Sequence, residues 1–398
     1  MLSEIAREVG TPVYVYDADV FRERIARLDT ALGGTPHLVC YSAKANDALA
    51  LLRIAGETGL GVDIVSGGEL YKTLRVGVPA ERIVFSGVGK RRDEIRDAVA
   101  AGVRSVNVES PGELDAVAAE AAALARVAPV SIRLNPDVAP DTHPSISTGQ
   151  ATSKFGVSAE AVLAGLRRAA ADPALEPVGI SFHVGSQLVD PEPILTAAER
   201  AAELWRELRD EGIALRDLDA GGGLGLPYDG NEEPDVEVYA QALAAIARGL
   251  GATLLLEPGR YLVGPAGVFL TRVLYVKDAP GRRIAVCDGG MNDLIRPSLY
   301  GAHHPIELVG TTVGRERGAV DVVGPVCETG DTFARGRDLP LPEPGDLLTV
   351  GYAGAYGRVM ASTYNARPLC AEVLAEGGSW RLIREAGAYS DLVRGESA

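Results

Sequence analysis

The chain is poor in cysteine, aromatic residues and long apolar runs. Aromatic residues make up only 5% of its 398 residues, so we expect a mainly aliphatic core. Its cysteines are Cys40, Cys287, Cys327 and Cys370, and none forms a C-x-x-C pair, which argues against a structural zinc site or a disulfide framework. No apolar run reaches the roughly 18 residues of a membrane helix. The opening segment MLSEIAREVG lacks the apolar centre of a signal peptide. We therefore expect a cytoplasmic protein.

Positive charge is also scarce. Lys and Arg number 39 against 54 Asp and Glu, which gives a formal net charge of −15. Nucleic-acid-binding proteins usually carry a basic excess, so we expect neither a nucleic-acid nor a membrane partner. The apolar and charged fractions, 46% and 23%, are those of a folded globular protein. A length of 398 residues favours two or three domains.

Short apolar runs alternate with helical stretches through the first two thirds of the chain. The runs occupy residues 37–43, 61–66, 82–87, 105–110, 129–135, 179–185, 215–221 and 253–259. Stretches rich in Ala, Leu and Arg, such as 112–125 and 192–212, separate them. This alternation is typical of βαβ units, and eight such units match a (β/α)₈ barrel of the TIM type. We predict this barrel over residues 18–265, with an open doubly wound sheet as the alternative.

The pattern changes at about residue 266. Short runs broken by Gly, Pro and Asp replace the helical stretches, which indicates an all-β domain over 266–398, a β-sandwich or Greek-key barrel. The segment 11–17, TPVYVYD, is also strand-like although it precedes the barrel. We expect that strand to join the β-domain.

Chemically useful side chains follow the predicted barrel strands, where the active sites of such barrels lie. Lys44 follows the first strand, His183 the sixth, the glycine run 221–225 the seventh, and Glu257 and Arg260 the eighth. Taken singly these are a surface cation, a core histidine, a turn and a local salt bridge. Together they offer an amine for an aldehyde, a backbone cradle for phosphate, and an acid for a ring nitrogen, which are the requirements of pyridoxal phosphate.

A series of motifs in one order carries a family resemblance. They are YSAKAN, VDIVSGGEL, FSGVGK, HPSISTG, SKFG, FHVGSQ, GGGLG, EPGR, MNDLIRP, CETGD and GAYG. From about residue 11 to 375 the chain resembles the fold-type III pyridoxal-phosphate decarboxylases. The resemblance implies a barrel that holds the cofactor and a β-domain that completes an active site shared across a homodimer.

The resemblance also implies roles for particular residues. For pyridoxal 5′-phosphate it implies Lys44 as Schiff-base lysine, His183 against the ring, Glu257 on the ring nitrogen, and Asp63, Ser186, Gly222, Gly223, Gly259, Arg260 and Tyr356 around them. For the substrate it implies Arg260, Arg296, Tyr300, Glu328 and Tyr356. Cys327 would return the proton, with Lys44 and His183 as the other catalytic residues. Cys327 and Glu328 would come from the partner subunit.

The expected reaction is loss of CO₂ from meso-2,6-diaminopimelate to give L-lysine, because Arg296 and Glu328 suit a substrate with a second amino-acid end. A related decarboxylase for carboxynorspermidine, ornithine or a carrier-linked substrate is one alternative. A racemase-type enzyme is disfavoured because it would place an arginine where Glu257 stands. A non-catalytic pyridoxal-phosphate protein would lack the second domain. The pair His303-His304 has no further ligands at suitable spacing, so we expect no metal.

Overall fold

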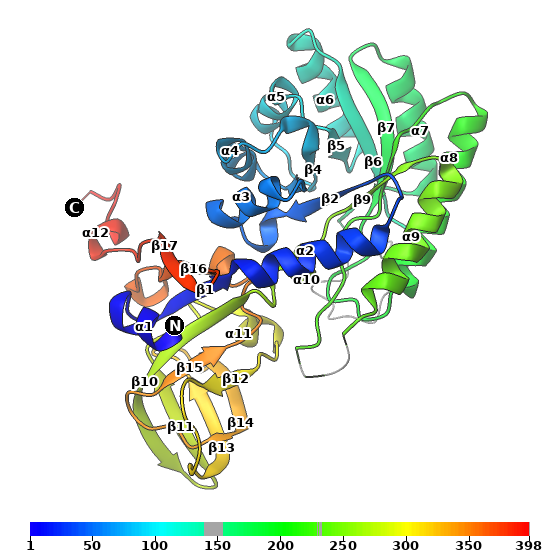
Figure 1. Cartoon of the computed structure of the whole chain (residues 1–398). Helices are drawn as coiled ribbons and strands as arrows, with labels where there is room; N and C mark the ends of the chain where they lie inside the picture. Colours follow the sequence, from blue (N-terminus) through cyan, green and yellow to red (C-terminus); the bar gives the residue numbers. More distant parts are fainter. Residues whose placement is uncertain (139–153, 229, 231–232, 398) are drawn as a thin grey trace. The chain divides into compact units, whose positions relative to one another are not determined.

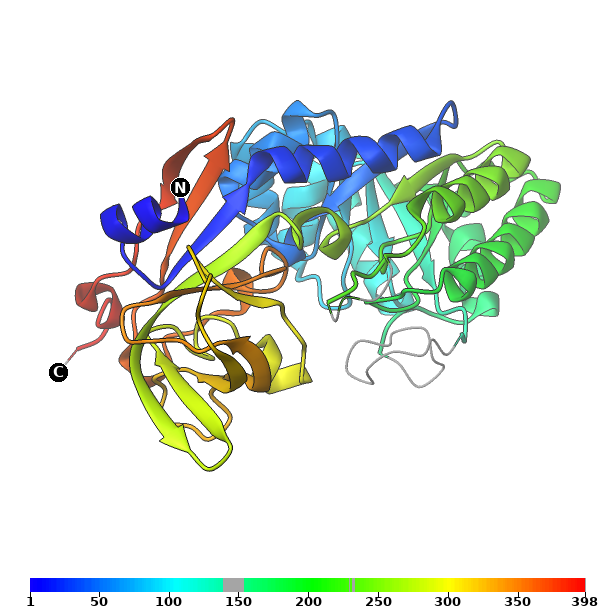
Figure 2. The ribbon, with the colours of Figure 1, turned by 60° about the horizontal axis from the view of Figure 1, so that its bottom comes forward.

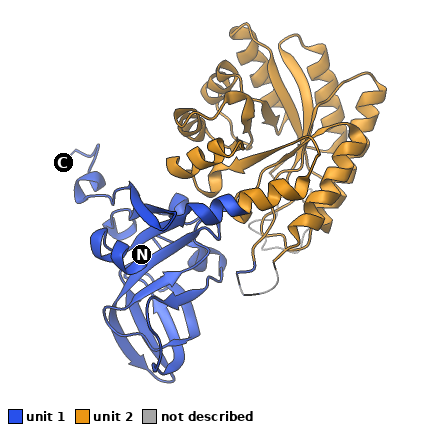
Figure 3. Ribbon diagram, viewed as in Figure 1, with its two compact units in different colours: residues 1–23, 227–231, 262–398 blue, residues 24–226, 232–261 orange. Residues whose placement is uncertain are grey.

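The structure is a computed structural model, and it describes residues 1–138, 154–228, 230 and 233–397. The chain divides into two compact units, which are coloured separately in Figure 3. Unit 1 comprises residues 1–23, 227–231 and 262–398, and unit 2 comprises residues 24–226 and 232–261.

Unit 2 is built on a closed parallel barrel (Figure 1). Its strands are β2 (His37–Ser42), β3 (Gly61–Ile64), β4 (Ile83–Phe85), β5 (Ser105–Val108), β6 (Ala128–Leu134), β7 (Leu175–Phe182), β8 (Asp217–Asp219) and β9 (Thr253–Leu256). Leu38 of β2 pairs with Leu255 of β9, so the first strand of the barrel meets the last. The predicted barrel is confirmed, and the open sheet, which would leave these two strands unpaired, is wrong.

Helices cover the outside of the barrel, and α8 and α9 lie side by side there (Figure 2). The helices of the chain are α1 (Leu2–Glu8), α2 (Ala18–Leu32), α3 (Leu49–Glu57), α4 (Gly67–Arg75), α5 (Arg92–Ala101), α6 (Pro111–Ala123), α7 (Ala159–Ala171), α8 (Glu192–Asp210), α9 (Val236–Leu250), α10 (Arg260–Val263), α11 (Arg296–Tyr300) and α12 (Tyr389–Leu392). None of the helices in the described part of the chain is long and apolar enough to cross a membrane.

Helix α9 shows why these segments are helical. The Asp235 side chain accepts hydrogen bonds from the first free backbone N–H groups, and Gly251 ends the helix with φ of 70°. Val236, Tyr239, Ala240, Leu243, Ala244, Ala247 and Leu250 are buried. Their spacing of three and four residues forms one apolar stripe. Burying each large member of this stripe stabilises the fold by about 1.5–3 kcal/mol.

Unit 1 contains a mixed β-sheet in the order β14-β13-β11-β10-β1-β16-β17, with β15 beside β10 and β12 beside β15. The strands are β1 (Val13–Asp17), β10 (Gly267–Ala279), β11 (Arg282–Cys287), β12 (Ile306–Leu308), β13 (Arg317–Val323), β14 (Thr332–Pro340), β15 (Leu347–Val350), β16 (Ala371–Glu376) and β17 (Ser379–Arg384). Strand β1 lies antiparallel to β10 and parallel to β16. The β-rich class expected for the C-terminal region is confirmed.

Candidate active site

Lys44 lies at the carboxyl end of the barrel, in the 3₁₀ turn η1 (Ala43–Ala45) that follows β2. Its Nζ is 3.1 Å from Oδ2 of Asp63, and the Ser42 hydroxyl donates to the same oxygen at 2.7 Å. Ser42 of β2 and Asp63 of β3 are paired in register on neighbouring strands, and this pairing brings their side chains together. Asp63 is fully buried, whereas the Lys44 side chain keeps 34% of its surface. The carboxylate therefore holds an accessible amine in one place.

His183 follows β7 and presents a neutral ring to the same face. Its Nδ1 accepts a hydrogen bond from the backbone N–H of Gly222 at 3.1 Å. Burial lowers the pKa of His183 well below its usual value, and the charges of Lys44 and Arg133 lower it further. The imidazole is therefore uncharged at neutral pH, and it lies close enough to Lys44 for the charge of that lysine to act on it.

The glycine run between β8 and α9 is closely packed on its neighbours. A Cβ at Gly222 would lie 2.3 Å from the carbonyl oxygen of Glu257, and a Cβ at Gly223 would lie 2.5 Å from that of Gly185. Only glycine permits this approach, which brings the backbone close to the strand ends. Nearby, Arg260 Nη2 donates to the Ser186 hydroxyl at 3.0 Å. A cation, a hydroxyl and small residues together suit a phosphate group.

Glu257 follows β9 and is almost wholly buried. Its Oε1 accepts a hydrogen bond from the Ser86 hydroxyl at 3.0 Å. Burial raises the pKa of Glu257 well above its usual value, and the carboxyl groups of Asp219 and Asp63 raise it further, against the opposing charge of Lys44. This face of the barrel thus gathers three buried carboxyl groups around one amine.

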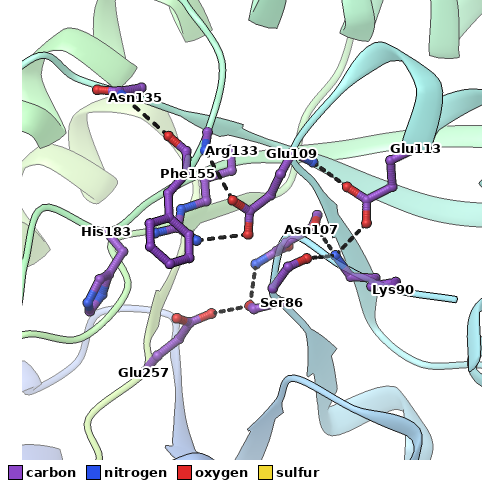
Figure 4. Close-up of polar contacts among 12 residues, drawn as sticks. Ser86, Lys90, Asn107, Glu109, Glu113, Arg133, Asn135, Phe155, His183 and Glu257 are labelled. Atoms are coloured by element: carbon purple, nitrogen blue, oxygen red, sulfur yellow. Dashed lines mark hydrogen bonds and ion pairs between the residues drawn. The ribbon is translucent and has the colours of Figure 1, made fainter. Parts of the chain in front are cut away.

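Sequence reasoning gave no role to several polar side chains at this face, although Ser86 lies within the motif FSGVGK. Ser86, Asn107 and Asp219 lie at or directly after the ends of β4, β5 and β8. Arg133, on β6, donates to Glu109 at 2.8 Å, and Glu109 also accepts from the backbone N–H of Gly156 at 3.0 Å (Figure 4). These residues, like Lys44, lie near the carboxyl ends of barrel strands. That position in the sequence could have marked them as candidate site residues.

Lys90 links the strand ends at this face to helix α6. Its Nζ donates to the carbonyl oxygens of Gly87 and Asn107, both at 2.6 Å, and to Glu113 at 2.8 Å (Figure 4). The Lys90 side chain is fully buried and that of Glu113 nearly so. One ammonium group therefore ties the carboxyl ends of β4 and β5 to α6.

Replacing Lys90 with methionine should lower the free energy of unfolding by about 3–5 kcal/mol, because Glu113 would lose its cation and keep only the hydrogen bond from the backbone N–H of Glu109. Urea denaturation would measure this loss. The double change Lys90→Met with Glu113→Gln should recover part of it, and Lys277→Met, at an exposed position of β10, should change stability by less than about 0.5 kcal/mol. A loss below about 1 kcal/mol for Lys90→Met would contradict this role.

Arg296, Tyr300 and Tyr356 belong to unit 1, whereas Lys44 and its neighbours belong to unit 2. Arg296 begins α11 and is buried, with Nη1 2.9 Å from His304 Nε2 and its guanidinium 4.7 Å from the centre of the Tyr228 ring. Tyr300 ends the same helix. Tyr356 lies in the left-handed region with φ of 56°, between glycines. These three residues stay assigned by the resemblance alone.

Cys327 and Glu328 lie in an exposed turn of unit 1. The Cys327 backbone N–H donates to Asn365 Oδ1 at 2.8 Å, and Glu328 Oε1 accepts from the N–H of Gly330 at 3.3 Å. Asp331 fixes the turn, because its two oxygens accept from the backbone N–H groups of Met291 and Val326, both at 2.6 Å. The segment before α11 and the turn that carries Cys327 are therefore held together.

The histidine pair does not form a metal site. His303 Nδ1 is 2.7 Å from the carbonyl oxygen of Tyr228, and His304 Nδ1 is 2.8 Å from that of Gly351. Over residues 1–138, 154–228, 230 and 233–397, no group of three or more His, Cys, Asp or Glu side chains could hold a metal ion.

The barrel face fits pyridoxal phosphate. Asp63, Asp219 and Glu257 are buried around Lys44, and Asp63 Oδ1 has no hydrogen-bond partner within the described residues. Buried carboxyl groups require cations or donors, so this face has room for one more positive group. A protonated ring nitrogen would supply it. The amine of Lys44 suits the aldehyde, and Arg260 with Ser186 suits the phosphate.

Comparison with known proteins points the same way. Residues 18–264 match the family described as "Pyridoxal-dependent decarboxylase, pyridoxal binding domain". The chain is 46% identical to the diaminopimelate decarboxylase of Pseudomonas aeruginosa, over 100% of this chain and 95% of that protein. It is 44% identical to that of Zymomonas mobilis, over 99% and 94%. The crystal structure of the Helicobacter pylori diaminopimelate decarboxylase complexed with L-lysine superposes with a TM-score of 0.95 at 41% identity, over 98% of both chains.

Proposed function

The chain belongs to the pyridoxal-dependent decarboxylases, and from that premise we infer that it removes CO₂ from diaminopimelate to give lysine. It is a carboxy-lyase that uses pyridoxal phosphate. The observation that carries the chemistry is the meeting of Lys44 with the buried carboxyls of Asp63 and Glu257 at one barrel face. We take the substrate to be meso-2,6-diaminopimelate and the reaction to be the last step of lysine synthesis.

We assign cofactor binding to the barrel domain, residues 18–265. When bound, pyridoxal phosphate accepts the electron pair that a departing carboxylate leaves behind. Lys44 would hold it through Nζ, and Asp63 keeps that amine in place. Arg260 and Ser186, with the glycines at 222, 223 and 259, would face its phosphate. Glu257 would hold the proton of the ring nitrogen, and the neutral ring of His183 would lie against its face.

The β-domain, residues 266–398, would recognise the substrate. Arg296 with Arg260, Tyr300 and Tyr356 would bind its carboxylates, and Glu328 its distal ammonium. Cys327 would return a proton to the carbon that has lost its carboxylate. As the family resemblance implies, Cys327 and Glu328 would serve the active site of the partner subunit in a cytoplasmic homodimer.

The direct test is to incubate the protein and pyridoxal phosphate with meso-diaminopimelate and to measure CO₂ and lysine. Parallel reactions would contain ornithine, lysine, arginine and carboxynorspermidine. Lysine and CO₂ from diaminopimelate alone are the expected result. Release of CO₂ from another substrate, with none from diaminopimelate, would keep the cofactor chemistry and overturn the assigned substrate.

Substitution of Glu328 with glutamine should raise KM for diaminopimelate by about 10- to 100-fold, because a hydrogen bond between charged groups is lost. The value of kcat should change by less than about threefold, since the distal ammonium takes no part in the chemistry. Steady-state kinetics would measure both. Glu316→Gln, at another exposed position of unit 1, should change neither. A fall in kcat at constant KM would contradict the assigned role.

A further inference from the structure

A chain of hydrogen bonds leads from Glu257 across the end of the barrel. Ser86 donates to Glu257 Oε1 at 3.0 Å, and Asn107 Nδ2 donates to the Ser86 hydroxyl at 3.2 Å (Figure 4). The same Nδ2 donates to Asp219 Oδ2 at 3.0 Å. All of these residues are buried, and they come from four different strand ends. This series of hydrogen bonds therefore joins the carboxyl groups of Glu257 and Asp219 through the barrel interior.

Burial raises the pKa of both Asp219 and Glu257, and the charge of the neighbouring Asp219 raises the pKa of Glu257 further. Two carboxylates in contact away from water repel strongly, so such a pair retains one proton. The donors decide where that proton resides. Asp219 accepts two N–H groups, from Asn107 at 3.0 Å and from the backbone of Gly221 at 3.0 Å. Hydrogen bonds from N–H groups favour the ionised form, so Asp219 is the anion and Glu257 holds the proton.

The surrounding charges agree with this distribution. Among the described residues, the titratable groups that act on the pair or lie beside it include Asp63, Lys44, Cys40 and Tyr239. Burial raises the pKa of the Cys40 thiol and of the Tyr239 hydroxyl, so both are neutral. Lys44 is paired directly with Asp63. The negative charge of Asp219 is therefore left to act on Glu257.

We propose that Asp219 is a positioning residue that acts through Glu257: it keeps a proton on Glu257 until the cofactor ring binds, and its charge then helps to keep a proton on the ring nitrogen. This inference rests on the proposed function for the identity of the ring. On binding, the Glu257 proton passes to the ring nitrogen if that nitrogen arrives unprotonated, and to solvent if it arrives protonated. In either case Glu257 becomes a carboxylate facing a cation.

The test measures the number of protons released or taken up when the cofactor binds, and it does not measure turnover. Protein freed of cofactor is titrated with pyridoxal phosphate in a calorimeter, in buffers of different ionisation enthalpy, at neutral pH. We expect the unsubstituted protein to displace more protons per site than Asp219→Asn, in which Glu257 has lost the nearest negative charge and is more ionised before binding. Equal proton numbers would overturn the proposal. Because no substrate is present, a wrong substrate assignment would leave this result unchanged, whereas failure to bind the cofactor would overturn both.

A matched control lies two residues away on β8. Asp217 is also buried, but it pairs with Arg104 at 2.6 Å and with Arg216 at 3.1 Å. Asp217→Asn removes a buried carboxylate from the same strand and should leave the proton count of the unsubstituted protein intact. A similar loss in both variants would point to a structural effect and overturn the proposal.

Infrared difference spectroscopy supplies a readout that does not depend on how Asp219→Asn folds. Cofactor binding to the unsubstituted protein should remove the band of one protonated carboxyl group, and Glu257→Gln should lack that change. No lost band in the unsubstituted protein would overturn the proposal.

In the Asp219→Asn enzyme we expect kcat to fall by about 10- to 100-fold with little change in KM, and the acidic limb of its pH profile to shift to lower pH.

Discussion

Replacement of Lys44 by alanine should lower CO₂ release from diaminopimelate by about 10⁴-fold or more, because the amine that would hold the cofactor is lost. The fold should survive, since a third of the Lys44 side chain is exposed and its partner Asp63 keeps the hydrogen bond from Ser42. Reduction of the loaded enzyme with borohydride, followed by peptide mass analysis, should place the cofactor on Lys44 and on no peptide of the variant.

Lys72→Ala is the matched control for this experiment. Lys72 also pairs with an aspartate of unit 2, Asp47, and its side chain is 29% exposed. Its replacement removes a lysine of similar exposure that also pairs with an aspartate, without touching the amine at the barrel face. Full activity in this control and a modest loss in Lys44→Ala would contradict the role given to Lys44.

Replacement of Glu257 by alanine should lower turnover by about 10²- to 10⁴-fold while cofactor affinity changes by less than about tenfold. The reason is that Glu257 acts on the electron demand of the ring, whereas the phosphate contacts and the covalent link dominate retention. Turnover and cofactor occupancy, the latter read from absorbance, would be measured on the same samples. Glu211→Ala, which removes an exposed glutamate paired with Arg167, serves as the control. Equal losses of turnover and occupancy in Glu257→Ala would contradict this role.

The barrel could be predicted because each of its strands is a short apolar run followed by a polar end. The register that closes the barrel is not local, and it decides which strand-end side chains meet. Ser, Asn and Asp are also ordinary turn residues, so the residue types of Asn107 and Asp219 gave no signal, and Ser86 was marked only as part of FSGVGK. Their significance appears only when β4, β5, β8 and β9 end around the same space.

The sheet of unit 1 was harder to predict in detail. Strand β14, with the sequence TFARGRDLP, carries charges and a glycine with φ of 57°, and no apolar alternation marks it. Strand β12 is only three residues long. Strand β14 pairs with β13, and β12 pairs with β15. Both segments are therefore strands because of tertiary pairing and not because of their local sequence. Among the candidate site residues, Lys44, Asp63, His183, Ser186, Glu257 and Arg260 come together in unit 2.

The pairing of β1 with β16 has a consequence for how the protein is made. Val13 lies opposite Ala371, so a strand that precedes the barrel finds its parallel neighbour only after every strand of the barrel has been synthesised. The barrel, by contrast, has all its strands once residue 256 has emerged. Domains generally fold as units during synthesis, in the order in which they are completed. The β1 segment therefore stays unpaired on that edge while the barrel folds, and the sheet of unit 1 is completed after the barrel.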